Sequence, residues 1–135
     1  MIGKVGSGLA ALVLSVALGP SRPPAEPITM TVAIKHSRFV PDVIRVPANT
    51  AVRFTVVNDD PIDHEFLLGD DDVQVAHEDG TEAAHGDRAG EISIAPYTTA
   101  STTYEFGAAG TVLLGCHLPG HWDYGMRATV VVGAG

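Results

Sequence analysis

Cysteine is almost absent from this chain of 135 residues, which contains only Cys116. A single cysteine cannot form a disulfide within the chain, so the fold must be stabilised by its hydrophobic core. The usual interpretation of a lone cysteine is a buried structural thiol. Whether that interpretation holds for Cys116 depends on the residues around it.

Basic residues are also scarce. Eight Lys and Arg face sixteen Asp and Glu, which gives a formal net charge of -8 and makes nucleic acid a poor partner. Twelve of the acidic residues lie between Asp59 and Glu91, where Arg88 is the only basic residue. This acidic region is either a solvated, solubilising loop or a docking patch for a basic partner protein, whose opposite charge would raise the rate of encounter.

No apolar run is long enough for a comfortable membrane span. The longest extends from Leu9 to Leu18, after Lys4 and before a Pro-rich stretch, which is the layout of a secretory signal. We therefore expect residues 1–26 to form a signal peptide and linker. The protein is then exported to the periplasm, the cell envelope or the extracellular space. The alternative is an uncleaved leader that anchors the protein to a membrane.

The rest of the chain, residues 27–135, has the length of a single domain. It is rich in Val, Thr, Ile and Ala, and Gly and Pro punctuate it, as in short strands joined by turns. Alternating or apolar segments predict strands at 28–36, 39–47, 51–58, 64–69, 91–96, 101–107, 111–116 and 126–133.

Two segments interrupt this pattern. Pro41 indicates an edge strand or a bend within 39–47. Residues 70–90 are charged and without sustained period, so we expect a long surface excursion with room for a helical turn. Seven or eight short strands at regular spacing predict an all-β sandwich or barrel.

Residues 116–126 read CHLPGHWDYGM and contain the pattern C-x(4)-H-x(4)-M, formed by Cys116, His121 and Met126. Soft sulfur ligands with imidazole select copper, and two His with one Cys and an axial Met is the arrangement of mononuclear electron-transfer copper. A second histidine is then required. The natural donor is His64, which opens a predicted strand after the turn NDDPID.

Each of these residues also has an ordinary structural interpretation. Met126 begins a Val-rich segment and can be core filler, His64 can be a turn histidine, and His121 a surface histidine. Their combination with Cys116 at this spacing favours a metal site over four unrelated roles.

The segments FVPDVIRVPANTAVRFTVVNDDPIDHEF and GCHLPGHWDYGMRATVVV resemble the cupredoxins, the plastocyanin- and azurin-like blue copper proteins, across nearly the whole chain after the leader. The resemblance implies a cupredoxin-like Greek-key β-sandwich with one type 1 copper near one end. The implied ligands are His64, Cys116, His121 and Met126. The four-residue gap from Cys to His is similar to that of azurin rather than the shorter gap of plastocyanin.

Two positions depart from the family pattern. Many cupredoxins have Asn after the first ligand histidine, where it helps to tie the two ligand loops together, and this chain has Glu65. Many also carry an aromatic residue directly before the ligand cysteine, and this chain has Gly115.

We therefore expect an exported, monomeric one-electron carrier, not an enzyme, with a redox partner protein that has a basic docking surface. The ligand set leaves no obvious open coordination position for a substrate. The alternative is a copper-handling protein that captures or delivers the metal, or confers resistance to it, outside the cytoplasm.

Other histidines raise further hypotheses. His117 makes the motif similar to the HCHxxxH segment of multicopper oxidases, but Gly115 replaces the first of its histidines and the chain has no other His-x-His pair. We expect His117 to face outward near the copper, and we assign no role to His36. His77 and His85, among several acidic residues, form either a weak second site for Cu(II) or Zn(II) or part of a mobile, solvated loop.

Overall fold

A computed structural model describes Gly3 and residues 25–133 of the chain. The expected signal peptide and linker, residues 1–26, therefore lie outside the described residues except for Gly3, Ala25 and Glu26. Within the described part, no helix has both the length and the hydropathy needed to cross a membrane.

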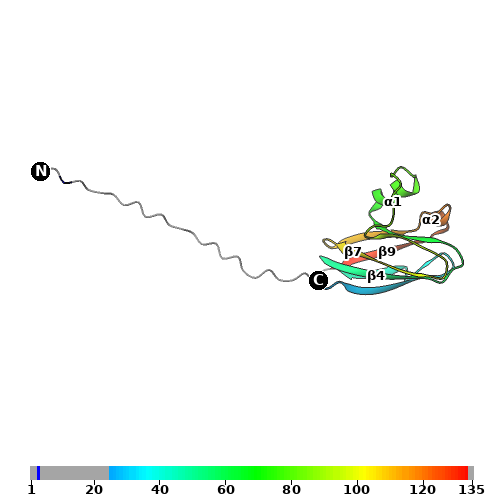
Figure 1. Cartoon of the computed structure of the whole chain (residues 1–135), viewed down its shortest axis with the longest axis horizontal. Coiled ribbons are helices and arrows are strands. Elements are labelled where there is room, and N and C mark those ends of the chain that lie inside the picture. Colours follow the sequence, from blue (N-terminus) through cyan, green and yellow to red (C-terminus); the bar gives the residue numbers. More distant parts are fainter. Residues whose placement is uncertain (1–2, 4–24, 134–135) are drawn as a thin grey trace.

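Two β-sheets face each other (Figure 1). The first has the strand order β2-β1-β4-β7, with β1 at Ile28–Ile34, β2 at Phe39–Val40, β4 at Thr50–Asn58 and β7 at Thr99–Phe106. The second has the order β3-β9-β8-β5-β6, with β3 at Val43–Pro47, β5 at His64–Gly69, β6 at Glu91–Ile94, β8 at Gly110–Gly115 and β9 at Arg127–Gly133. The predicted all-β sandwich is confirmed.

The core lies between the sheets because alternate residues of the strands point inward. In β4 the buried residues are Val52, Phe54, Val56 and Asn58, and in β9 they are Ala128, Val130 and Val132. Phe54 packs against the ring of Phe66 from the other sheet at 5.3 Å between centroids. Burying apolar side chains in this way contributes about 1.5–3 kcal/mol for each large one, so the fold needs no disulfide.

The described residues form nine strands, one more than the longest count predicted from the sequence. The extra strand arises because the predicted strand at 39–47 is two strands, β2 and β3, separated at Pro41 and Asp42. Proline has no N–H to donate to a strand partner, so pairing stops there. β2 then pairs with β1 in one sheet and β3 with β9 in the other, which carries the chain between the layers.

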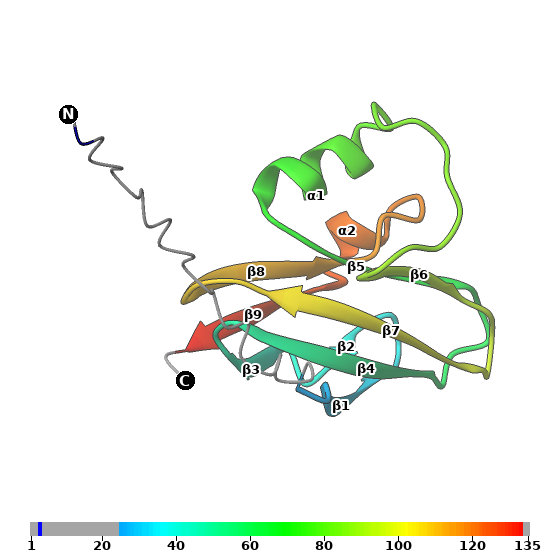
Figure 2. The ribbon, with the colours of Figure 1, turned by 60° about the vertical axis from the view of Figure 1, so that its left-hand side comes forward.

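The excursion between β5 and β6 begins with a helix longer than the single turn expected. Helix α1 spans Asp71–Glu78, and its N-cap residue Asp70 accepts a hydrogen bond from the N–H of Val73 through its side chain. This capping pattern, with Asp71 and Asp72 in the first turn, is the sequence signal that identifies the helix start. Figure 2 shows α1 beside α2, at His121–Tyr124, above the sheet that contains β8, β5 and β6.

Candidate metal centre

The first two candidate ligands lie on neighbouring strands. His64 is the first residue of β5, and Cys116 directly follows β8. β5 and β8 pair antiparallel, with Leu67 opposite Gly115, so the start of one strand lies beside the end of the other. This pairing brings together two residues that are far apart in the sequence.

The other two candidates come from the loop between β8 and β9, which contains the short helix α2. Gly120 and Gly125 flank this helix with φ of 79° and 99°, a left-handed conformation that glycine adopts without strain. The turn they make folds the loop back, so that the N–H of Cys116 donates to the carbonyl oxygen of Met126 over 3.2 Å. His121 begins α2, and the side chain of Met126 is fully buried in the core cluster that contains Cys116.

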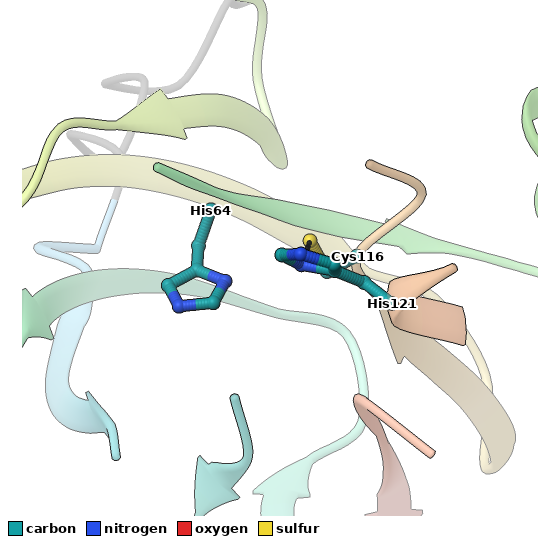
Figure 3. A group of neighbouring side chains, drawn as sticks. All are labelled: His64, Cys116 and His121. Carbon is teal, nitrogen blue, oxygen red and sulfur yellow. Dashed lines mark hydrogen bonds between the residues drawn. The ribbon is translucent and has the colours of Figure 1, made fainter. Parts of the chain in front are cut away.

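Three ligand atoms converge at this end of the sandwich (Figure 3). A nitrogen of His64, Sγ of Cys116 and a nitrogen of His121 all lie within 4.8 Å of one another. Sγ of Cys116 is 3.3 Å from Nδ1 of His121, and the centroids of the two imidazole rings are 5.1 Å apart. The structure thus brings together three of the four candidates that the sequence singles out, and Met126 lies in the same buried core cluster as Cys116.

Asp60 sets the orientation of His64. Nε2 of His64 donates a hydrogen bond to Oδ2 of Asp60 over 2.9 Å, which leaves Nδ1 as the nitrogen with a lone pair. Nδ1 is buried and has no hydrogen-bond partner among the described residues. A buried polar atom without a partner is costly in a native structure unless an ion or water completes it.

The sequence does not single out Asp60, although its place four residues before His64 in the NDDPID turn is the available signal. Burial works to raise the pKa of Asp60, but hydrogen bonds from the N–H groups of Ser37 and His36 and from His64 outweigh it and lower that pKa. The carboxylate therefore stays ionised and keeps a proton on Nε2 of His64.

Burial shifts the pKa of the two candidate ligands Cys116 and His121. It raises the pKa of the Cys116 thiol, although N–H groups directed at the sulfur oppose this change. Burial also lowers the pKa of His121, and the nearby His64 adds to the shift, so the imidazole is neutral and its nitrogen can act as a ligand.

Glu65 joins the His64 strand to the Cys116 loop. Its N–H donates a hydrogen bond to Sγ of Cys116 over 3.2 Å, and its Oε2 accepts one from the N–H of His117 over 3.1 Å. The tie that the resemblance assigns to Asn at this position is therefore made here by a carboxylate.

The space beside Gly115 is already filled, which explains why no aromatic residue precedes Cys116. A Cβ at position 115 would meet Oε1 of Gln74 at 2.5 Å, Cζ3 of Trp122 at 2.7 Å and Nε2 of His117 at 2.9 Å. Trp122 stacks on His117 with 4.7 Å between ring centroids. An aromatic side chain from the loop thus occupies the space over Gly115.

The expectation that His117 faces outward is wrong, because its side chain is only 1% exposed. Its Nδ1 bonds to Oε2 of Glu78 and its Nε2 to Oε1 of Gln74, each over 2.7 Å. Both acceptors belong to α1, whose packing the sequence pattern does not reveal. With both nitrogens occupied, His117 holds α1 against the loop and has no nitrogen free for a metal.

The donor set fits copper. One thiolate and two imidazoles in a closed, mostly buried site match the His₂Cys arrangement of mononuclear electron-transfer copper, with a thioether residue in the same buried cluster. The unpartnered Nδ1 of His64 faces Cys116 and His121, which would bind such an ion together with it.

Comparisons with known proteins agree with this geometry. The copper-resistant cuproprotein CopI of Rubrivivax gelatinosus is 34% identical over 99 residues, covering 70% of this chain and 59% of the relative. Auracyanin-B of Chloroflexus aurantiacus is 29% identical over 128 residues, covering 81% of this chain and 53% of the relative. This chain thus spans little more than half the length of these relatives.

A solved structure of auracyanin B superposes with a TM-score of 0.65 at 27% identity, covering 82% of this chain and 92% of that chain. The family model described as "Cupredoxin-like domain" matches residues 8–96. The two-sheet sandwich, the gathered ligand atoms and these matches lead to one conclusion. The chain belongs to the cupredoxin-like family.

Proposed function

We propose that His64, Cys116, His121 and Met126 hold one type 1 copper ion and that the protein carries single electrons. The observation that supports this most strongly is the convergence of two imidazole nitrogens and one thiol sulfur within 4.8 Å. When bound, copper supplies a one-electron couple between Cu(II) and Cu(I). A carrier takes one electron from a donor and passes that electron to an acceptor, with no bond made or broken.

The residues around the site favour rapid exchange of electrons without binding of a substrate. His64, Cys116 and Met126 are buried, which keeps water away from most of the site. His121 is partly exposed, so its ring is the part of the ligand set nearest to a partner. The hydrogen bonds of Asp60 and Glu65 fix their neighbours in place, which limits rearrangement when the charge of the site changes.

The test is a visible and EPR spectrum after addition of Cu(II) to the protein. We expect an intense visible absorption from thiolate-to-copper charge transfer, one type 1 copper per chain, and reversible one-electron cycling. Cys116→Ser should abolish the absorption because it removes the thiolate. His36→Asn is the matched control, since His36 is exposed and Asn tolerates its positive φ of 52°.

A colourless wild-type protein would contradict the type 1 site. If the colour persists in Cys116→Ser, the thiolate is not the ligand. More than one tightly bound copper together with oxidase or nitrite reductase activity would instead favour an enzyme.

Copper handling is the second candidate function, because a relative is named a copper-resistant cuproprotein. The two functions differ in how firmly the metal is retained. A carrier cycles many times with slow copper loss, whereas a handling protein transfers copper readily to an acceptor. Mixing the loaded protein with a copper chelator of graded strength and following the visible absorption separates the two.

We further propose export from the cytoplasm and an electron-transfer partner with a basic surface. The Pro-rich stretch after the apolar run supports export, and mass spectrometry of the protein recovered from the cell envelope would test cleavage of the leader. Exposed acidic residues at and beside α1 support a basic partner; they are Asp70, Asp71, Asp72, Glu78 and Asp79.

A further inference from the structure

A second group of potential metal ligands lies in the excursion between α1 and β6, away from the ligands proposed above. His77 is in the last turn of α1, Glu82 and His85 follow in the loop, and Glu91 begins β6. One ligand atom each from His77, Glu82 and His85 lies within 4.8 Å of the other two.

The distances show that two imidazoles face two carboxylates. Nδ1 of His77 is 2.7 Å from Oε2 of Glu82, and Nε2 of His77 is 2.9 Å from Oε1 of Glu91. Nε2 of His85 is 3.5 Å from Oε1 of Glu82 and 3.3 Å from Oε1 of Glu91. All four side chains are less than one third exposed, so the group is set into the surface.

One nitrogen in this group lacks a hydrogen bond. Nδ1 of His77 is buried and has no hydrogen-bond partner among the described residues, even though Glu82 is close. The two atoms are near each other without the alignment of a hydrogen bond. Nε2 of His77 faces Oε1 of Glu91, which can only accept, so Nδ1 is the nitrogen left with a lone pair for an ion.

The tautomer of His85 is set so that a lone pair faces the group. Nδ1 of His85 is 2.8 Å from the carbonyl oxygen of Gly86, which can only accept, so Nδ1 carries the proton of the neutral ring. Nε2 then directs its lone pair toward Glu82 and Glu91. A backbone carbonyl that fixes the distal nitrogen is the usual outer support of a metal-binding histidine.

Arg88 supports the two carboxylates from the outer side. Its Nε is 2.6 Å from Oε2 of Glu91, and its Nη2 pairs with Oε1 of Glu82. Oε2 of Glu82 and Oε1 of Glu91 remain directed at His77. The hydrogen bond from Arg88 lowers the pKa of Glu82, so that this carboxylate is ionised and available as a ligand.

The group borders an open cavity of about 280 Å³ in the surface. Its lining includes His77, Glu82, His85 and Glu91. An ion can therefore reach the imidazoles from solvent without movement of the sheet.

We propose that His77, Glu82 and His85 form a second metal site that binds one divalent cation of the Cu(II) or Zn(II) type, with Glu91 supporting His77 at its other nitrogen. Imidazole with carboxylate suits these two metals, whereas the absence of sulfur from the group disfavours Cu(I). The site is independent of the proposed type 1 centre, because no residue is shared. His117 packs between them, with its ring centroid 5.7 Å from that of His77.

The competing explanation is that protons, not a metal, bridge the group. One protonated histidine together with Arg88 would balance the charges of Glu82 and Glu91 without any ion. The two explanations differ when metal is added at a pH where free imidazole is neutral. A metal site then binds the added ion, whereas a group bridged by protons does not.

The experiment uses the full-length protein with Cys116→Ser, which removes the thiolate of the first centre. Isothermal titration with Zn(II) at pH 7.5 should show a bound equivalent that His85→Gln eliminates in the same background. Loss of a direct ligand should lower zinc affinity at least as much as loss of an outer partner, which typically costs about 10- to 100-fold. Glu82→Gln should have the same effect.

His36→Asn in that background is the matched control and should keep the equivalent, because His36 belongs to neither group. Circular dichroism establishes that each variant is folded. His85 lies in an exposed loop, so its replacement leaves the core intact even where His77→Gln does not.

A parallel titration with Cu(II) distinguishes the metals. Copper should bind more tightly than zinc. It should give an EPR spectrum with nitrogen coupling but no intense visible band, and His85→Gln should remove this EPR spectrum. The proposal is overturned if neither metal binds, or if His85→Gln and Glu82→Gln bind as much metal as their parent. Failure of the type 1 centre would appear separately, as missing colour in the wild-type protein.

Discussion

The N–H of Glu65 donates a hydrogen bond to Sγ of Cys116 over 3.2 Å, joining two residues that are 51 positions apart. The side chain of the same glutamate bonds to the N–H of His117. One residue therefore supplies both a donor to the sulfur and a negative charge close to it. The two effects oppose each other, because the hydrogen bond stabilises electron-rich sulfur whereas the carboxylate favours the more positive Cu(II) state.

The substitution Glu65→Gln separates these effects. The side-chain amide of glutamine can accept the same hydrogen bond without the charge, so we expect the reduction potential to rise. At an effective dielectric constant of about 20 and a separation of several ångströms, the rise is on the order of tens of millivolts. Cyclic voltammetry measures it. Glu105→Gln, which removes an exposed charge from β7 on the other sheet, is the control, and an equal rise in both variants would refute the local effect.

Replacement of Asp60 by Asn should loosen His64. The carboxylate of Asp60 accepts from the N–H groups of His36 and Ser37 over 2.6 and 2.7 Å and from His64 over 2.9 Å, and an amide cannot accept at both of its ends. We expect the free energy of unfolding to fall by about 1–3 kcal/mol. Copper affinity should fall by about 10- to 100-fold, as is typical when the outer partner of a ligand is lost.

Denaturant unfolding and chelator competition measure these two losses for Asp60→Asn. Asp63→Asn removes an exposed carboxylate from the same turn and should change neither quantity appreciably. Unchanged copper affinity in Asp60→Asn would show that His64 is oriented without its hydrogen bond to Asp60.

Replacement of Gly115 by Ala should displace Trp122. The added Cβ would lie 2.7 Å from the indole and 2.5 Å from Oε1 of Gln74, so the neighbours must move apart. Overpacking of this kind typically costs about 1–3 kcal/mol. Because Trp122 is the only tryptophan in the chain, its fluorescence emission reports the displacement directly.

Gly110→Ala is the matched control for Gly115→Ala. Gly110 lies at the other end of β8, and a Cβ there would meet nothing within 4 Å. Stability and emission should stay close to those of the wild type. Similar losses in both variants would mean that the strand, rather than the space under Trp122, requires glycine.

The acidic surface should control the rates of electron transfer with small charged reagents. The formal net charge is -8, so oxidation of the reduced protein by the tris(phenanthroline)cobalt(III) cation should slow as salt is added, while oxidation by ferricyanide should accelerate. The Debye length shortens from about 30 Å at 0.01 M to about 10 Å at 0.1 M ionic strength, so stopped-flow measurements over this range suffice. A change in the same direction for both reagents would contradict electrostatic control.

Most of the fold and the convergence of the candidate ligands could be predicted from the sequence. Strands such as β4 alternate apolar and polar residues, and the turn before His64 and the spacing from Cys116 to Met126 are local patterns. Such patterns depend on neighbours in the chain, which a sequence displays directly.

The surroundings of the site could not be predicted in the same way. The burial of His117 depends on Gln74 and Glu78 from α1, 43 and 39 positions away, and the requirement for Gly115 depends on Trp122 folding back over it. These contacts follow from how α1 and the Cys116 loop pack on the sheet. No spacing along the chain encodes them.

The position of β9 has a consequence for the order of events during synthesis. β9 follows the Cys116 loop in the chain, yet it lies inside its sheet, between β3 and β8. A nascent chain that ends before β9 leaves β3 without a strand partner and β8 paired only with β5, and the loop that follows β8 is then anchored at one end only. The proposed copper centre can therefore reach its final geometry only after this strand has been made.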